Sequence, residues 1–478
     1  MGVIPIYLIN ENEMLDKCGK IGGTPLLNWV RLKHLHEKGD STHAVWVGED
    51  GMPVYVIAKI SAKITQWSVA HLASALPDGE YELHDEHFSA ELSRDEHAKL
   101  ALGWLLEQYR YGEYKVIAKK SAKLCYDAGL SNEIESLRDA IFTVRDLINA
   151  PPNHMMPEDL VQAAMKLASS HNNNSHNEKI HKNSSQKSLA HKSSSYKVEV
   201  SVTSGEELER EYPAIHTVGK ASAAKPCLID LRWGDESHPL VAIIGKGVCF
   251  DSGGLDIKGS ANMRLMKKDM GGAACALGLA QLIINRGLKI RLRVLIPAVE
   301  NAISGNAFRT SDIIKMRSGL TVEVGNTDAE GRLILADAIT DACAQHPDLL
   351  IDLATLTGAA RTALGTDIPA VFSNDDALAA ELCQIARQEN DFLWQLPLYE
   401  GYATQIKSDI ADCNSTGTSG YGGAIIAALF LQQFVTLNTP WLHLDMMAWN
   451  IKSLAGRPIG GEAMGLRALF ALLEKRYK

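Results

Sequence analysis

Three short, largely apolar runs constrain the fold of this 478-residue chain more than any other feature. They lie at 240–244, 349–353 and 441–444. Such runs are typical of strands covered on both faces, as in sheets that carry helices on each side. Patterns with helical spacing lie between and after these runs, at 270–286, 329–344, 424–435 and 462–476. The sequence therefore predicts an α/β fold for the C-terminal part.

A smaller α/β domain is predicted at the N-terminal end. Short β-rich runs at 4–8, 43–47 and 53–60 are bounded by Gly, Asp and Pro, and helical patterns follow at 96–111 and 132–148. The last pattern stops at the sequence Ala-Pro-Pro-Asn, which breaks a helix. We therefore predict two domains, a smaller one over 1–145 and a larger one over 146–478.

Residues 171–196 interrupt the larger domain with a stretch rich in His, Asn, Ser and Lys. This composition cannot bury a core, so it predicts a flexible insertion. Its histidines, His171, His176, His181 and His191, suggest metal capture as an alternative. Their spacing is irregular and no Cys or acid cluster accompanies them, which favours a solvated loop.

Charge and cysteine content limit the classes of function and the compartment. The formal net charge is −9, which counts against nucleic acid or an anionic membrane as the main partner. The eight cysteines are scattered without CxxC pairs, as expected for free thiols in a reducing compartment. Neither a basic, apolar leader nor a run long enough to span a bilayer is apparent. These features predict a cytoplasmic protein with no membrane partner.

The first chemically informative segment follows the run at 240–244. Lys246 and Asp251 lie in a Gly-rich stretch at the predicted carboxyl end of a strand, where open α/β sheets place their ligand sites. The stretch lacks the spacings of phosphate-binding loops, so a nucleotide site is disfavoured. A structural turn with a surface lysine remains the alternative for this segment taken alone.

Further acids lie at the starts of predicted helices. Asp269 precedes the helix at 270–286, and Asp328, Glu330 and Arg332 crowd the start of the next one. Taken by itself, Asp269 is explained as a helix N-cap, and Asp328 can also cap the helix that follows it. However, a cluster of acids at helix starts is costly to bury unless cations compensate its charge. With Asp251, the four carboxylates suit one or two divalent ions. Lys246 would join them only as a neutral amine.

These residues resemble the leucyl (cytosol) aminopeptidase family of two-metal metallopeptidases. The octapeptide Asn-Thr-Asp-Ala-Glu-Gly-Arg-Leu at 326–333 is similar to that family's signature and is highly specific. Further similar segments lie at 146–153, 353–359, 393–398, 407–413 and 441–445. The resemblance runs from residue 146 to the C-terminus, apart from the insertion. It implies a larger catalytic domain with a mixed sheet flanked by helices.

The resemblance also implies a two-metal site and a mechanism. One ion would be held by Lys246, Asp251, Asp269 and Glu330, and the other by Asp251, Asp328 and Glu330. The ions would be zinc or manganese, with magnesium or cobalt as substitutes, and a hydroxide bridging them would attack the N-terminal peptide bond. Lys258 and Arg332 match the catalytic positions. Lys258 would stabilise the oxyanion, and Arg332 would hold a bicarbonate ion that shuttles protons.

Positions matching the family's substrate-binding surface are Met266, Asn326, Ala329, Thr355, Gly358 and Met447. At Met447 the family usually has a small residue, so a reshaped side-chain pocket is expected. The resemblance further implies a homohexamer that degrades peptides with a free N-terminus in the cytosol. The rival hypotheses are a nucleic-acid-binding role, disfavoured by the acidic charge, and an inactive scaffold, disfavoured because every catalytic position is filled.

Overall fold

The computed structural model describes residues 2–37, 42–88, 91–116, 122–181 and 196–478 of the chain, and side chains within 174–181 are not described. It divides into two compact units, one of residues 1–139 with 452–459 and one of residues 140–451 with 460–478. The division lies inside helix α4 (Ala128–Asn149), whereas the sequence places it at 145/146. Residues 452–459, assigned from sequence to the larger domain, join the first unit instead.

The first unit contains a five-stranded sheet in the order β2-β3-β1-β4-β5. Pairing is parallel except between β2 and β3. Helix α3 begins two residues before its predicted start because Ser93 and Glu96 form a capping box. The elements are β1 (Ile4–Asn10), α1 (Met14–Leu32), β2 (His43–Val47), β3 (Pro53–Ile60), α2 (Leu72–Ala75), β4 (Gly79–His84), α3 (Arg94–Glu107) and β5 (Ala122–Cys125).

The second unit is built on a nine-stranded mixed sheet in the order β15-β14-β17-β13-β8-β10-β7-β6, with β9 also pairing with β10. The strands β10, β8, β13 and β17 run parallel at its centre. On either side, β14 and β7 run antiparallel to them, and β6 pairs antiparallel with β7. The strands are β6 (Glu199–Ser204), β7 (Cys227–Trp233), β8 (Leu240–Gly245), β9 (Gly247–Asp251), β10 (Arg291–Asn301), β13 (Leu349–Ala354), β14 (Ala370–Ser373), β15 (Trp394–Gln395) and β17 (Trp441–Asp445). The three apolar runs are thus neighbouring strands near the centre of the sheet.

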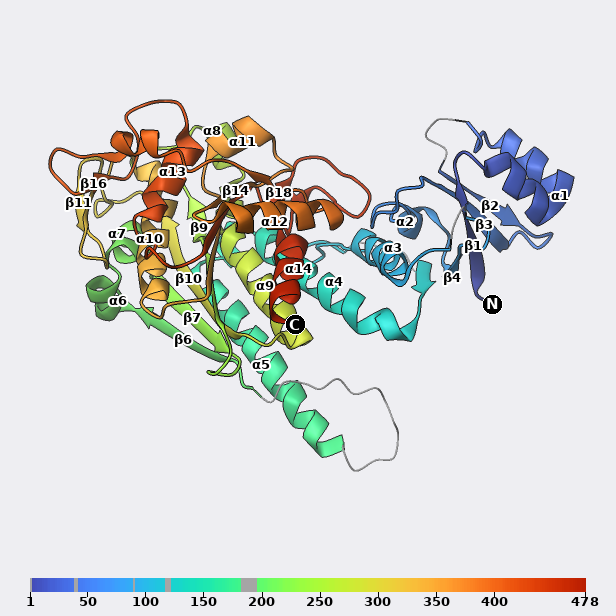
Figure 1. The fold of residues 1–478 in the computed structure, drawn as a ribbon, viewed down its shortest axis with the longest axis horizontal. Helices are drawn as coiled ribbons and strands as arrows, with labels where there is room; N and C mark the ends of the chain where they lie inside the picture. Colours follow the sequence, from blue (N-terminus) through green and yellow to red (C-terminus); the bar gives the residue numbers. More distant parts are fainter. Residues whose placement is uncertain (1, 38–41, 89–90, 117–121, 182–195) are drawn as a thin grey trace. The chain divides into compact units, whose positions relative to one another are not determined.

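Helices cover both faces of this sheet (Figure 1). Ala242 and Ile244 of β8 belong to an apolar cluster with α10 (Glu330–Cys343) and α13 (Gly423–Gln432). Alternate residues such as Ile243 point to the opposite face, where α9 (Gly271–Arg286) contacts β8 and α14 (Leu466–Tyr477) packs on α9. The predicted α/β class and flanked mixed sheet are confirmed.

Shorter elements complete the second unit. Strands β11 (Ile313–Lys315), β12 (Thr321–Glu323) and β16 (Cys413–Asn414) form a small sheet, and β18 (Trp449–Asn450) pairs with β19 (Gly460–Gly461). The remaining α-helices are α6 (Gly205–Glu211), α7 (Pro213–Gly219), α8 (Ser260–Met263), α11 (Gly358–Leu364) and α12 (Asp376–Gln388). Among the described helices, none combines the length and apolar character needed to cross a bilayer.

Helix α5 (Pro157–His181) extends into the segment predicted as an insertion. At 171–181, therefore, the described chain is helical. Asn172 accepts a hydrogen bond from the Val198 amide at 3.0 Å and donates one to the Val198 carbonyl at 3.1 Å, which ties the helix to the chain before β6. Residues 182–195 lie outside the described residues, so the flexible insertion stays a prediction. The same holds for metal capture by its histidines.

Candidate metal centre and active site

The candidate site lies at the carboxyl ends of the central strands. Lys246 separates β8 from β9, and Asp251 is the last residue of β9. A Cβ at Gly272, the second residue of α9, would lie 2.0 Å from the carbonyl oxygen of Leu353 in β13. Because glycine has no side chain, the start of α9 packs directly against this strand end. Asp269, three residues earlier, is thereby held beside Lys246.

The acids at the helix starts do not cap the long helices. Asp269 lies in a 3-10 helix at Met266–Met270, and neither the α9 N-cap nor the α10 N-cap forms a side-chain hydrogen bond. Asn326 instead caps the short turn before α10, accepting a hydrogen bond from the Asp328 amide at 2.7 Å. The capping interpretation of Asp269 and Asp328 is therefore wrong. Both carboxylates are available for other partners because their main chains enter the helices through 3-10 turns.

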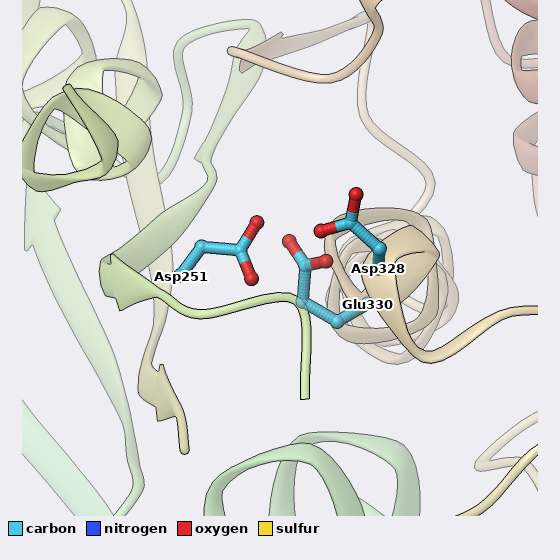
Figure 2. Close-up of side chains that lie close together, drawn as sticks. All are labelled: Asp251, Asp328 and Glu330. Carbon is cyan, nitrogen blue, oxygen red and sulfur yellow. The ribbon is translucent and has the colours of Figure 1, made fainter. Parts of the chain in front are cut away.

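Three of the predicted ligands converge in space. Asp251, Asp328 and Glu330 each offer an oxygen, and these oxygens lie within 4.8 Å of one another. Figure 2 shows their carboxylates pointing toward a common centre. The fourth acid, Asp269, is linked to these three by an ion pair with Lys246. The Lys246 Nζ lies 2.7 Å from Asp269 Oδ2 and 3.0 Å from Glu330 Oε1. All five predicted metal ligands therefore form one cluster.

Glu330 is the most informative member of this cluster. It is 1% exposed, and neither carboxylate oxygen accepts a hydrogen bond from the described residues. Burial and the nearby Asp251 raise the pKa of Glu330 to about 8. Burial likewise raises the pKa of Asp251 to about 6. Among the described residues, the Lys246 ammonium, which Asp269 shares, is the one cation in ion-pair contact with this buried carboxylate. A buried carboxylate with so little compensation is costly, so the residues present fit divalent cations that would coordinate these oxygens.

Two lysines partly neutralise the acids. Burial opposes the charge of Lys246, but the surrounding carboxylates, led by Asp269, outweigh it and raise its pKa. Lys258 responds in the same way to Asp251, which lies 2.7 Å from its Nζ, and it also contacts Asp328. Ligation through a neutral Lys246 amine therefore requires the positive charge of an ion to reverse the direction of this shift.

Two neighbouring polar groups orient the acids. Sequence reasoning missed Asn301 and assigned Thr355 to the substrate-binding surface. Asn301, at the end of β10, donates hydrogen bonds to Asp251 Oδ1 at 2.8 Å and to the Thr327 carbonyl at 3.1 Å. Thr355 donates to Asp269 Oδ1 at 2.8 Å. Asn301 is the last residue of a strand adjacent to β8, but only the sheet order brings it to Asp251.

A cavity of about 620 Å³ opens beside the carboxylates. Arg332 is buried in its wall and donates a hydrogen bond to the Ser415 carbonyl at 2.7 Å, and burial lowers its pKa to about 10. The predicted residues in its lining are Lys246, Asp251, Lys258, Met266, Asp269, Asp328, Arg332, Thr355, Gly358 and Met447. Glu330, Asn326 and Ala329 are not in the lining. The lining also contains Lys268, Leu356 and Arg361, which sequence reasoning did not single out.

Comparison with known proteins shows the family of the chain. A family model described as the cytosol aminopeptidase family, catalytic domain, matches residues 142–470. A second, described as the M17 aminopeptidase N-terminal domain, matches residues 4–127. The N-terminal domain, which lies outside the resemblance found in the sequence, thus matches a family domain as well.

Individual relatives span most of the chain. Peptidase B of Cronobacter sakazakii is 43% identical over 355 residues, covering 73% of this chain and 78% of the relative. The crystal structure of a cytosol aminopeptidase from Coxiella burnetii superposes with a TM-score of 0.90 at 39% identity, covering 100% of this chain and 98% of that one. The bottromycin maturation enzyme BotP in complex with Mn superposes with a TM-score of 0.83 at 27% identity, covering 99% and 100%. The chain therefore belongs to the cytosol aminopeptidase family, M17, and is an aminopeptidase.

Proposed function

We propose that this aminopeptidase hydrolyses the N-terminal bond of peptides with the help of two divalent ions. The observation that carries the proposal is the convergence of the buried Asp251 and Glu330 with the more exposed Asp328 beside a cavity, with neither Glu330 oxygen accepting a hydrogen bond within the described residues. Carboxylates at this spacing suit hard or borderline divalent ions.

We assign the five clustered residues to two metal ions. Lys246, Asp251, Asp269 and Glu330 would hold one ion, and Asp251, Asp328 and Glu330 the other. Zinc or manganese are the proposed ions, with magnesium or cobalt as substitutes, and the manganese complex of BotP supports this choice. When bound, such ions supply Lewis acidity and generate a hydroxide nucleophile from water near neutral pH.

The chain's own residues would position the substrate and stabilise charge. The Lys258 ammonium lies in the cavity lining beside Asp251 and Asp328, where it can donate to the oxygen that becomes negative during attack on the scissile carbonyl. Arg332 presents a buried guanidinium to the same cavity, which suits a small anion such as bicarbonate as a proton carrier. Met266, Thr355, Gly358 and Met447 would contact the N-terminal side chain, with Asn326 and Ala329 at the margin.

The proposed setting is peptide turnover in the cytoplasm by a homohexamer. The eight cysteines are all free, which agrees with a reducing compartment. The name of the Coxiella burnetii relative, a cytosol aminopeptidase, supports the same location. The hexamer rests on the family resemblance alone, and sedimentation of the purified protein would test it.

Adding Mn²⁺ or Zn²⁺ to metal-stripped protein is expected to raise its unfolding temperature. The ions would neutralise buried carboxylates that the Lys246 ammonium compensates only in part. At an ion concentration of 100 times Kd, the linkage corresponds to about 2.7 kcal/mol of added stability. Differential scanning fluorimetry across an ion titration measures the shift. If it equalled the shift with Na⁺ at matched ionic strength, the metal site would be excluded.

Free-amine specificity provides the direct test of function. Leucine p-nitroanilide with Mn²⁺ or Zn²⁺ is expected to release its chromophore, whereas N-acetyl-leucine p-nitroanilide is expected to be inert because its nitrogen is no longer a free amine. Chelation should abolish the reaction and added metal restore it. Cleavage of both compounds would mean that the amine is not recognised. If neither were cleaved, nor a panel with other free N-terminal residues, the proposed function would be wrong.

A further inference from the structure

The side chain of Asn301 connects the two chain segments that carry Asp251 and Asp328. It is fully buried at the end of β10. Its amide nitrogen lies 2.8 Å from Asp251 Oδ1 and 3.1 Å from the Thr327 carbonyl oxygen. An ionised carboxylate and a carbonyl only accept hydrogen bonds, so both amide protons are used and the orientation of the amide is fixed. One side chain therefore ties the Asp251 carboxylate to the main chain directly before Asp328.

The two oxygens of Asp251 have different partners. Oδ1 accepts hydrogen bonds from the Gly253 amide at 2.9 Å and from Asn301. Oδ2 lies 2.7 Å from Lys258 Nζ, and because Lys258 also contacts Asp328, Oδ2 is the oxygen that faces Asp328. Rotation of the carboxylate would break both hydrogen bonds to Oδ1. Asn301 and the Gly253 amide therefore hold Oδ2 toward the centre of the acidic cluster.

The other end of the Asn301 amide shows that packing does not explain this residue. Its Oδ1 is buried and accepts no hydrogen bond from the part of the chain that the structure describes. A Cβ at Gly254 would lie 3.0 Å from this oxygen, so the loop backbone closes over it. A buried carbonyl oxygen without a donor costs stability, which an apolar residue of similar size would avoid. The asparagine is therefore explained by the hydrogen bonds that its NH2 group donates.

Asp269 is oriented by a different side chain. Thr355 donates to Asp269 Oδ1 at 2.8 Å, and Lys246 Nζ lies 2.7 Å from Oδ2. Among the described residues, the Asn301 amide donates only to the two acceptors given above and reaches neither Asp269 nor Lys246. Asp328 belongs to one of the two proposed ligand sets, whereas Asp269 and Lys246 belong to the other. Asn301 and Thr355 thus contact different ligand sets.

We propose that Asn301 is a positioning residue for one of the two divalent ions, the one whose ligand set contains Asp328. It would act by holding Asp251 Oδ2 and the Asp328 turn at a fixed separation, so that an ion meets oxygens that are already ordered. The inference rests on the proposed function and concerns the affinity of a single ion. Loss of a polar group that orients metal ligands typically weakens metal binding by about 10- to 100-fold.

Asn301→Leu tests the proposal because leucine has a similar size and no hydrogen-bond donor. Calorimetric titration of metal-free protein with Mn²⁺ is expected to show two bound ions in the wild type. In Asn301→Leu, the Kd of one ion should rise by about 10- to 100-fold and that of the other by much less. The difference is expected because Lys246, Asp269 and Thr355 keep their contacts.

Thr355→Val is the matched variant for the other ion. Valine has the shape of threonine without the hydroxyl, so this change removes the donor to Asp269 and leaves the Asn301 hydrogen bonds in place. Each single variant should weaken one binding step, and the double variant should weaken both, because the two hydrogen bonds support different ions. A double variant in which only one step is weakened would place both residues at the same ion and overturn the assignment.

Excess metal distinguishes positioning from a direct role in the reaction. Asn301→Leu removes no ligand and no group that lines the cavity. Its turnover of leucine p-nitroanilide should therefore be low at limiting Mn²⁺ and should return to the wild-type kcat when Mn²⁺ is raised by about 10- to 100-fold. A kcat that stays low at saturating Mn²⁺ would contradict the proposal.

Thermal unfolding without metal establishes that each variant is folded. Asn301→Ser, whose side chain is shorter by one bond, provides a second variant with the same expected loss of ion binding. Unchanged Kd values, or equal weakening of both ions, in either folded variant would overturn the proposal. Failure of both variants to fold would do the same, since Asn301 would then serve the fold. Wild-type protein that binds fewer than two Mn²⁺ ions is a different outcome, because it would remove the proposed two-ion function itself.

Discussion

Glu330→Gln is expected to lower kcat/KM by about 10³-fold or more while leaving the fold intact. Glutamine has nearly the same shape as glutamate but offers a single neutral oxygen and an amide that repels a cation. Glu330 belongs to both proposed ligand sets, so its replacement weakens the binding of both ions. The expected readouts are loss of turnover and loss of the unfolding-temperature shift with Mn²⁺ or Zn²⁺.

The metal-free stability of Glu330→Gln separates a functional defect from misfolding. Burial raises the Glu330 pKa to about 8, above the value of 4.5 for the unfolded chain. The stability that protonated Glu330 allows is therefore lost as pH rises from about 4.5 to about 8, and above that range the penalty stays constant. Removing the acid should leave the metal-free variant at least as stable as wild type at pH 8.

Glu323→Gln serves as the control for this variant. Glu323 lies on β12 outside the cavity and accepts a hydrogen bond from Ser408 at 2.6 Å, which a glutamine oxygen also accepts. It should keep its activity and its metal-dependent stabilisation. An active, metal-stabilised Glu330→Gln would contradict the ligand role of Glu330.

Lys258→Ala is expected to reduce kcat by about 10²- to 10³-fold with a smaller effect on KM. The ammonium is proposed to act on the oxygen that gains charge in the transition state, so its loss affects the chemical step more than substrate binding. Steady-state kinetics with leucine p-nitroanilide at saturating metal measure the two constants separately.

Two further measurements exclude a structural role for Lys258. The metal-dependent unfolding shift should persist in Lys258→Ala, because the variant removes a cation that contacts Asp251 and Asp328 and removes no ligand. Lys258→Arg should recover part of the lost kcat, since it restores a positive charge at the same place. A kcat within tenfold of wild type in the alanine variant would eliminate Lys258 from the mechanism.

Some local interpretations failed because competing partners are invisible in the sequence. Asp269 and Asp328 stand where N-caps commonly occur, but 3-10 turns precede α9 and α10, and Asn326 caps the turn before Asp328. Lys268 appears in the sequence as an ordinary polar neighbour of Asp269. Its burial follows from the packing of the Met266–Met270 turn under the cavity, which no local pattern encodes.

The sequence by itself determined the α/β class and the family. The runs at 240–244, 349–353 and 441–444 became neighbouring strands β8, β13 and β17, because unbroken apolar segments require cover on both faces. The octapeptide at 326–333 identified the family because it resembles that family's signature.

Only the tertiary structure decided which groups meet. The order of the nine strands brings Asn301 to Asp251 and the acids of three separate segments within 4.8 Å of one another. It also placed Lys268 and Arg361 in the cavity lining, where neither side chain forms an ion pair with a described residue. Strand order, burial and the pairing of charges depend on contacts between residues far apart in the chain, whereas periodicity and motifs report only on neighbours.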